Sequence, residues 1–378
     1  MKPKKWIILF LTLYYLLASV LITDFGLIYI IIAILFFILY IIYEGINISF
    51  FLNTSLFDLF LLFLFSYTIL ILIDIRYWAA EYDKFDIAAY YLFFFIIPLI
   101  FAILTFESSK FERYLTESIY IFFLITSILI LVNANINGID WNESILIKNS
   151  KFHKNGIACI YELLMVFIYF SLNNKTFLKY TSLALGFICL IAIGSKTAIG
   201  LVAIVIIISK IPIKIIICGV IIISVSIIWL IINSDIFIQD FFYTSFTRIL
   251  IWENVIEDIS KSNVSIIFGN GPETFTSSVK EGDSFGMNHP HNIVLYLLQV
   301  YGIVGLVIFS IYYYKVFKII RIKSSPYFFP FTIYILHSMF DVGWTKSTGF
   351  FASLFLGMAI GFSYKKKIQI EKENSFSQ

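Results

Sequence analysis

Residues 26–43 read Gly-Leu-Ile-Tyr-Ile-Ile-Ile-Ala-Ile-Leu-Phe-Phe-Ile-Leu-Tyr-Ile-Ile-Tyr and contain no charged side chain. The run is close to the length of about 20 residues that a helix needs to cross the hydrocarbon core of a bilayer. A helix satisfies its own backbone hydrogen bonds in lipid, whereas the strands of membrane barrels alternate apolar and polar residues. This run does not alternate, and it therefore predicts a transmembrane helix.

Similar runs recur along the whole chain. Apolar residues make up 60% of the 378 residues, charged residues make up 13%, and the mean hydropathy is +0.93. A water-soluble globule of this composition has too little polar surface to cover its apolar residues. We therefore expect an all-α polytopic membrane protein with about twelve transmembrane helices. The expected spans are 6–23, 26–43, 56–73, 88–106, 117–133, 157–172, 177–193, 197–209, 213–232, 293–312, 326–340 and 349–364.

Lysine and arginine residues predict the orientation of these spans. The short loops on one side, with the two termini, hold more of them than the longer loops on the other side. By the positive-inside rule the first side is cytoplasmic, so both termini are expected there. The segments 74–87, 134–156 and 233–292 are then extracytoplasmic. We expect N-terminal transmembrane helices over 1–192, a core over 193–364 that includes the loop 233–292, and a basic cytoplasmic tail over 365–378.

The long loop 233–292 is the most informative segment outside the spans, because long loops in membrane proteins with short connections tend to be functional. Residues 244–259 have the pattern of a capped amphipathic helix, and Trp252, Val255, Ile256 and Ile259 share one face. Arg248 lies four residues before Trp252, so the two side chains are expected to be neighbours. A turn is expected at 266–272.

The end of this loop leads directly into the span at 293–312. Asn288 or His289 is expected to cap that helix, with Pro290 in its first turn. His291 and Asn292 then lie at the outer membrane surface, in the first turn. The positive end of a helix dipole favours an anionic ligand, so an anion site is expected here.

Further polar residues interrupt the apolar sequence on the same side. They are Arg76 with Tyr77 and Trp78, the tetrapeptide Gly194-Ser195-Lys196-Thr197, and the pair His337 and Asp341. Two acids, Asp58 and Glu162, lie in or near apolar spans, where an ionisable residue is a functional candidate by default.

The order of these polar motifs resembles that of the O-antigen polymerase and ligase superfamily. Its members carry a Ser-Arg at a helix start, an Arg-x-x-x-Trp, a Gly-x-Gly, and a His-Asn-x-x-Leu followed by Gly-x-x-Gly. His337-Ser338 and Asp341 are also similar to the C-terminal part of the family, and the resemblance covers roughly 190–360. The motifs here are Ser195-Lys196-Thr197, Arg248…Trp252, Gly269-Asn270-Gly271, His291-Asn292…Leu295 and Gly302…Gly305-Leu306.

The resemblance implies glycosyl transfer at the outer face of the bacterial inner membrane. The donor in that family is an oligosaccharide on undecaprenyl pyrophosphate, and the reaction needs no metal, nucleotide or other cofactor. The implied activity is an O-antigen or capsular polysaccharide polymerase of lipopolysaccharide or polysaccharide biosynthesis. Chain-length regulator and flippase proteins are the implied partners, beside the membrane lipids.

The site residues suit this chemistry. The resemblance gives His291 the role of general base for a sugar hydroxyl, and His289 is the alternative. Arg248 is expected to bind the pyrophosphate bidentately, and Lys196 adds a point-like charge where the family has arginine. The remaining expected substrate contacts are Asn292, Trp252 and Arg76.

Other functions remain open or are disfavoured by the sequence. A ligase that transfers glycan to the lipid A core shares the motifs, and a lipid-linked sugar transporter or flippase is an alternative of another class. Cys159, Cys189 and Cys218 lie in apolar runs, and no metal-ligand spacing appears, so no metal site is expected. No basic stripe indicates nucleic-acid binding.

Overall fold

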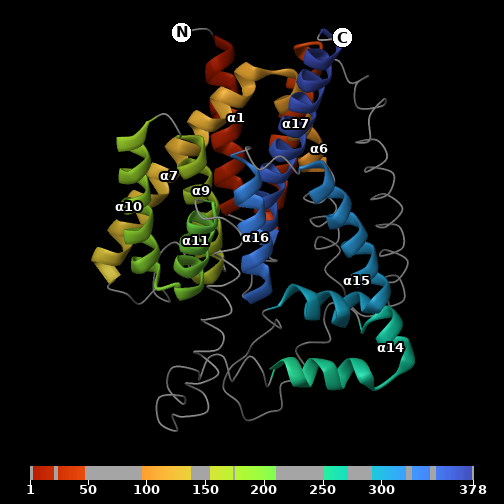
Figure 1. The fold of residues 1–378 in the computed structure, drawn as a ribbon. Helices are drawn as coiled ribbons and strands as arrows, with labels where there is room; N and C mark the ends of the chain where they lie inside the picture. Colours follow the sequence, from red (N-terminus) through yellow and green to blue (C-terminus); the bar gives the residue numbers. More distant parts are fainter. Residues whose placement is uncertain are drawn as a thin grey trace. The chain divides into compact units, whose positions relative to one another are not determined.

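The computed structural model describes residues 3–20, 24–46, 96–137, 154–172, 175–209, 251–270, 292–320, 326–340 and 346–376 (Figure 1). Within these ranges the chain is predominantly helical and contains no strand, which confirms the all-α class. The predicted spans 56–73 and 213–232 lie outside the described residues. The other predicted spans fall wholly or partly within them, and each contains a helix there.

The chain divides into two compact units. Unit 1 comprises residues 1–199 and 308–378, and unit 2 comprises residues 200–307. Helix α11 runs from unit 1 into unit 2, and α15 runs from unit 2 into unit 1. The described helices are α1 (Pro3–Val20), α2 (Asp24–Tyr43), α6 (Ile97–Glu107), α7 (Ser109–Asn137), α9 (Lys154–Ser171), α10 (Thr176–Ile193), α11 (Lys196–Ile208), a helix over 251–260, α14 (Asn263–Phe268), α15 (Ile293–Ile319), α16 (Phe328–Phe340) and α17 (Lys346–Phe376).

The helices of unit 1 are apolar on their exposed faces as well as in the core. Helices that are apolar all round need a surrounding apolar solvent, and a bilayer supplies it. Among the described helices, Lys110–Val132, Thr176–Ile193 and Ile293–Ile319 are long and apolar enough to cross a membrane, and several shorter apolar helices accompany them. The large apolar side chains that are more than half exposed include Phe10, Leu39, Ile42, Ile128 and Ile191.

Aromatic side chains hold the core of unit 1 together. Tyr15 of α1, Phe37 of α2 and Phe101 of α6 meet pairwise with ring centroids 5.2–6.5 Å apart, in the edge-to-face arrangement that aromatic pairs favour. The hydroxyl of Tyr15 donates a 2.7 Å hydrogen bond to the backbone oxygen of Phe350 in α17. Helices from both ends of the sequence therefore share one core.

Charged side chains gather at one end of unit 1. The Lys5 ammonium lies 2.8 Å from the Glu117 carboxylate, the Tyr327 hydroxyl donates to Glu112 at 3.0 Å, and Lys365 lies 3.7 Å from Glu112. These contacts bring the starts of α1, α7 and α16 to the same end as the basic part of α17. Lys5 and Lys365 therefore both lie near the start of α7.

Some predicted spans differ from the helices. Helix α7 begins at Ser109, before the predicted 117–133, and α17 continues to Phe376, so the basic residues after 364 lie on the same helix as the span. The span predicted over 293–312 lies within the candidate membrane span Ile293–Ile319, but its helix is interrupted: Gly302 has non-helical backbone angles (φ 64°, ψ −162°) and separates two helical parts of α15. The part after Gly302 rises about 25 Å, slightly less than a bilayer core of about 30 Å.

Glycine allows α17 to pack closely against α6. A Cβ on Gly361 would lie closer than 3.0 Å to the backbone oxygen of Ala102, and a Cβ on Gly357 would collide with the backbone of Pro98. Gly357 and Gly361 form a Gly-x-x-x-Gly pair, the pattern with which membrane helices approach one another.

We predict that Gly361→Leu lowers the thermal unfolding temperature of the protein in detergent, because the side chain must push α17 away from α6. Overpacking of this kind costs about 1–3 kcal/mol or more. Gly200→Leu is the matched control, since a Cβ at Gly200 meets nothing within 4 Å. Equal unfolding temperatures for the two variants would contradict the close packing of α6 and α17.

Candidate functional site

The described part of the long loop forms a small helical assembly in unit 2. Val255 is fully buried in the 251–260 helix, and Ile251 and Ile259 lie on the same buried face. Trp252 packs against this face, as do Ile266, Leu295 and Leu298. The amphipathic helix is thus present over 251–260, although Ile256, which the sequence assigns to the apolar face, is 54% exposed.

Two glycines join this assembly backbone to backbone. Gly269 follows α14 with φ 74°, and Gly302 breaks α15 with φ 64°. A Cβ on Gly269 would collide with the backbone of Val300, and a Cβ on Gly302 would collide with the backbone of Ile267. The Gly-x-Gly and Gly-x-x-Gly motifs of the sequence therefore meet at their first glycines.

A hydrogen bond reinforces this contact. The backbone N–H of Asn270 donates to the backbone oxygen of Gln299 at 2.6 Å. A carbonyl in the last turn before a helix break loses its usual intrahelical partner. Asn270 therefore caps the first part of α15 from outside.

Asn292 forms the other end of this helical part. Its Oδ1 accepts hydrogen bonds from the backbone N–H groups of Val294 at 2.9 Å and Leu295 at 3.2 Å. Helix α15 begins at Ile293, so Asn292 is the N-cap and does not lie in the first turn. The expectation that Asn288 or His289 caps this helix is therefore wrong.

Gln299 is a polar residue that the sequence reading did not select. Its side chain is 2% exposed, and its Nε2 has no hydrogen-bond partner among the described residues. Buried amide groups are nearly always hydrogen-bonded, so such a donor needs an explanation. In the sequence, a single glutamine within the otherwise apolar run 293–300 is the feature that could have indicated this residue.

Lys196 begins α11, as the Ser-Lys motif predicts. Gly194 ends α10 in the left-handed conformation (φ 73°), and the buried Ser195 side chain accepts a hydrogen bond from the Ala198 N–H at 3.3 Å. Lys196 is exposed in the following turn. This motif belongs to unit 1, whereas Trp252 and Asn292 belong to unit 2.

Several predicted site residues lie outside the described residues, and their roles remain predictions. These residues are His291, Arg248, His289, Arg76, Tyr77, Trp78, Asp58 and Asp341.

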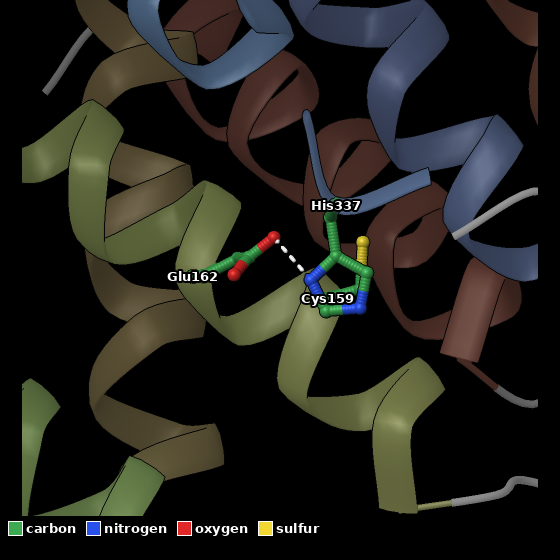
Figure 2. Close-up of side chains that lie close together, drawn as sticks. All are labelled: Cys159, Glu162 and His337. Carbon is green, nitrogen blue, oxygen red and sulfur yellow. Dashed lines mark ion pairs between the residues drawn. The ribbon is translucent and has the colours of Figure 1, made fainter. Parts of the chain in front are cut away.

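A second cluster of reactive side chains lies inside unit 1. Cys159 and Glu162 project from α9, and His337 projects from α16 (Figure 2). All three residues are fully buried, with 0% of their surface exposed, and their candidate ligand atoms lie within 4.8 Å of one another. The His337 Nδ1 lies 2.8 Å from the Glu162 Oε1. The sequence singled out Glu162 and His337 separately, and the fold brings them together.

Comparison with known proteins assigns no family. A scan against family models matches none of them, and a search of curated proteins finds no match. The function must therefore be argued from the residues and their arrangement.

We predict that Gly302→Ala and Gly269→Ala lower the unfolding temperature more than Gly45→Ala does. All three positions have positive φ, and Gly269 and Gly302 (ψ −179° and −162°) lie in a region that only glycine adopts readily, where an L-residue is strained by roughly 1–3 kcal/mol. At Gly45 a Cβ meets nothing within 4 Å, so only the first two variants add a backbone collision. Thermal unfolding of the purified variants measures the difference, and an equal decrease in all three would contradict the glycine contact.

Proposed function

We propose that the protein is a polymerase that joins oligosaccharide repeats carried on undecaprenyl pyrophosphate, at the outer face of the bacterial inner membrane. One observation carries the proposal. Trp252, Gly269, Asn292 and Gly302 come from four motifs of the polymerase and ligase pattern, and they belong to one packed assembly. Motifs that only mark unrelated turns would have no reason to pack together.

The start of α15 suits an anionic donor. Asn292 caps the helix by accepting hydrogen bonds from two of its first N–H groups, and the positive end of the helix dipole attracts phosphate. His291 immediately precedes this cap in the sequence. The pyrophosphate and the general base are thereby proposed to act at the same end of one helix.

The proposed reaction exchanges one bond to the anomeric carbon for another. The acceptor hydroxyl attacks that carbon, and His291 takes its proton, a role for which imidazole is well matched at neutral pH. The bond from the anomeric carbon to the pyrophosphate oxygen breaks, and undecaprenyl pyrophosphate leaves with the electron pair. Arg248 stabilises the negative charge that develops on it.

The buried amide of Gln299 also supports a carbohydrate substrate. Its Nε2 is a donor without a partner among the described residues, in the same helical part that Asn292 caps. Sugar hydroxyls and phosphate oxygens are acceptors that such a donor can bind.

Two alternatives make different predictions. A ligase would transfer the finished glycan to the lipid A core, so deletion of its gene would leave glycan on the lipid carrier. Deletion of a polymerase gene would leave single repeats attached to the core. A transporter is favoured by one observation, the buried ionisable pair Glu162 and His337 inside the helices of unit 1.

We predict that His291→Ala and Arg248→Ala abolish long glycan chains at normal protein level. Loss of a general base alone lowers the rate by about 10²–10⁴-fold. Gel electrophoresis of surface glycan from a producing strain measures the effect. Lys261→Ala is the matched control in the same loop, because its exposed ion pair with Asp258 contributes little. Long chains that persist in both test variants would refute the polymerase and the ligase alike.

We also predict that Asn292→Asp and Asn292→Ala differ. Aspartate keeps the N-cap but places a negative charge beside the anionic donor, so polymerisation decreases while the unfolding temperature is retained. Alanine loses the cap and about 1 kcal/mol of stability. The measurements are glycan length and thermal unfolding, and wild-type chain length in Asn292→Asp would contradict a pyrophosphate site at this helix end.

A further inference from the structure

We propose that Cys159, Glu162 and His337 bind a zinc ion that connects α9 to α16. The proposal is independent of the glycosyl transfer proposed above, in which the ion takes no part. It rests on the convergence of three ligand types inside unit 1.

The two helices supply the ligands at suitable positions. Cys159 and Glu162 are three residues apart on α9, so they project from the same face of the helix. His337 approaches this face from α16 (Figure 2). Pairs of ligands at i and i+3 on one helix, completed by a neighbouring helix, are how helical bundles build metal sites.

The ligand chemistry matches zinc. Thiolate sulfur, imidazole nitrogen and carboxylate oxygen all bind Zn²⁺ at about 2.0–2.3 Å. Tetrahedral geometry at those bond lengths separates the ligand atoms by roughly 3.3–3.6 Å, inside the 4.8 Å within which the three atoms lie. The His337 Nδ1 and Glu162 Oε1, now 2.8 Å apart, must separate by about half an ångström.

Charge balance also favours zinc. A thiolate and a carboxylate neutralise Zn²⁺, His337 binds in its neutral form and a water molecule would take the fourth position, so the occupied site has no net charge. A neutral site suits a region where isolated charges are strongly disfavoured. An ion pair of Glu162 with His337 would be neutral as well, and the zinc content of the purified protein distinguishes the two arrangements.

The test measures zinc in full-length protein, purified in detergent with a tag that contains no histidine. Elemental analysis should find about one zinc per chain, and Cys159→Ser or His337→Gln should remove most of it. Cys189→Ser is the matched control, because Cys189 is equally buried but bonds to the backbone oxygen of Ser127 on another helix. Its zinc content should equal that of the wild type.

Replacement of zinc by Co²⁺ gives a second readout that does not require the site variants to fold. Wild-type protein and the Cys189→Ser and Cys218→Ser variants should all show a thiolate-to-cobalt charge-transfer band in the near ultraviolet. The proposal is overturned if purified wild-type protein neither contains nor takes up stoichiometric zinc. It is also overturned if the cobalt band is absent, or if zinc persists unchanged in folded Cys159→Ser.

Discussion

A bilayer offers no hydrogen bonds to the peptide backbone, so each N–H and C=O inside it must find a partner within the chain. Continuous helices meet this requirement, and most of the described chain takes that form. A break is tolerated only where other groups satisfy the freed positions. The same need for partners holds wherever water is excluded, and at Gly302 it is met by Asn270 of the loop, whose N–H donates to the Gln299 oxygen before the break. In unit 2 this hydrogen bond accompanies the close backbone contact of Gly269 with α15.

The apolar spans were predictable from sequence, because each is a long run of residues that cannot be covered in water. The Ser195-Lys196 helix start was predictable as well, since a short polar interruption between apolar runs indicates a tight turn. The break at Gly302 was not. Glycine in an apolar run is equally typical of close helix packing, as at Gly357 and Gly361, and the contact with Gly269 is a tertiary feature.

The N-cap of α15 shows a different limit. Several adjacent polar residues are capable of capping, and only the backbone decides which one does, so Asn292 was assigned to the wrong position. The cluster of Cys159, Glu162 and His337 was missed for another reason. Its members lie on helices far apart in the chain, and no local spacing connects Cys159 with His337.

The contact of Gly269 and Asn270 with Gln299 and Gly302 joins the end of α14 to the middle of α15, and residues 271–291 connect these elements along the chain. Forming this contact closes the loop between α14 and α15 and therefore costs conformational entropy. That entropic cost depends only weakly on the length of the loop. A change in the length of residues 271–291 is then expected to change the free energy of unfolding by only about 0.6 kcal/mol for each doubling of that segment.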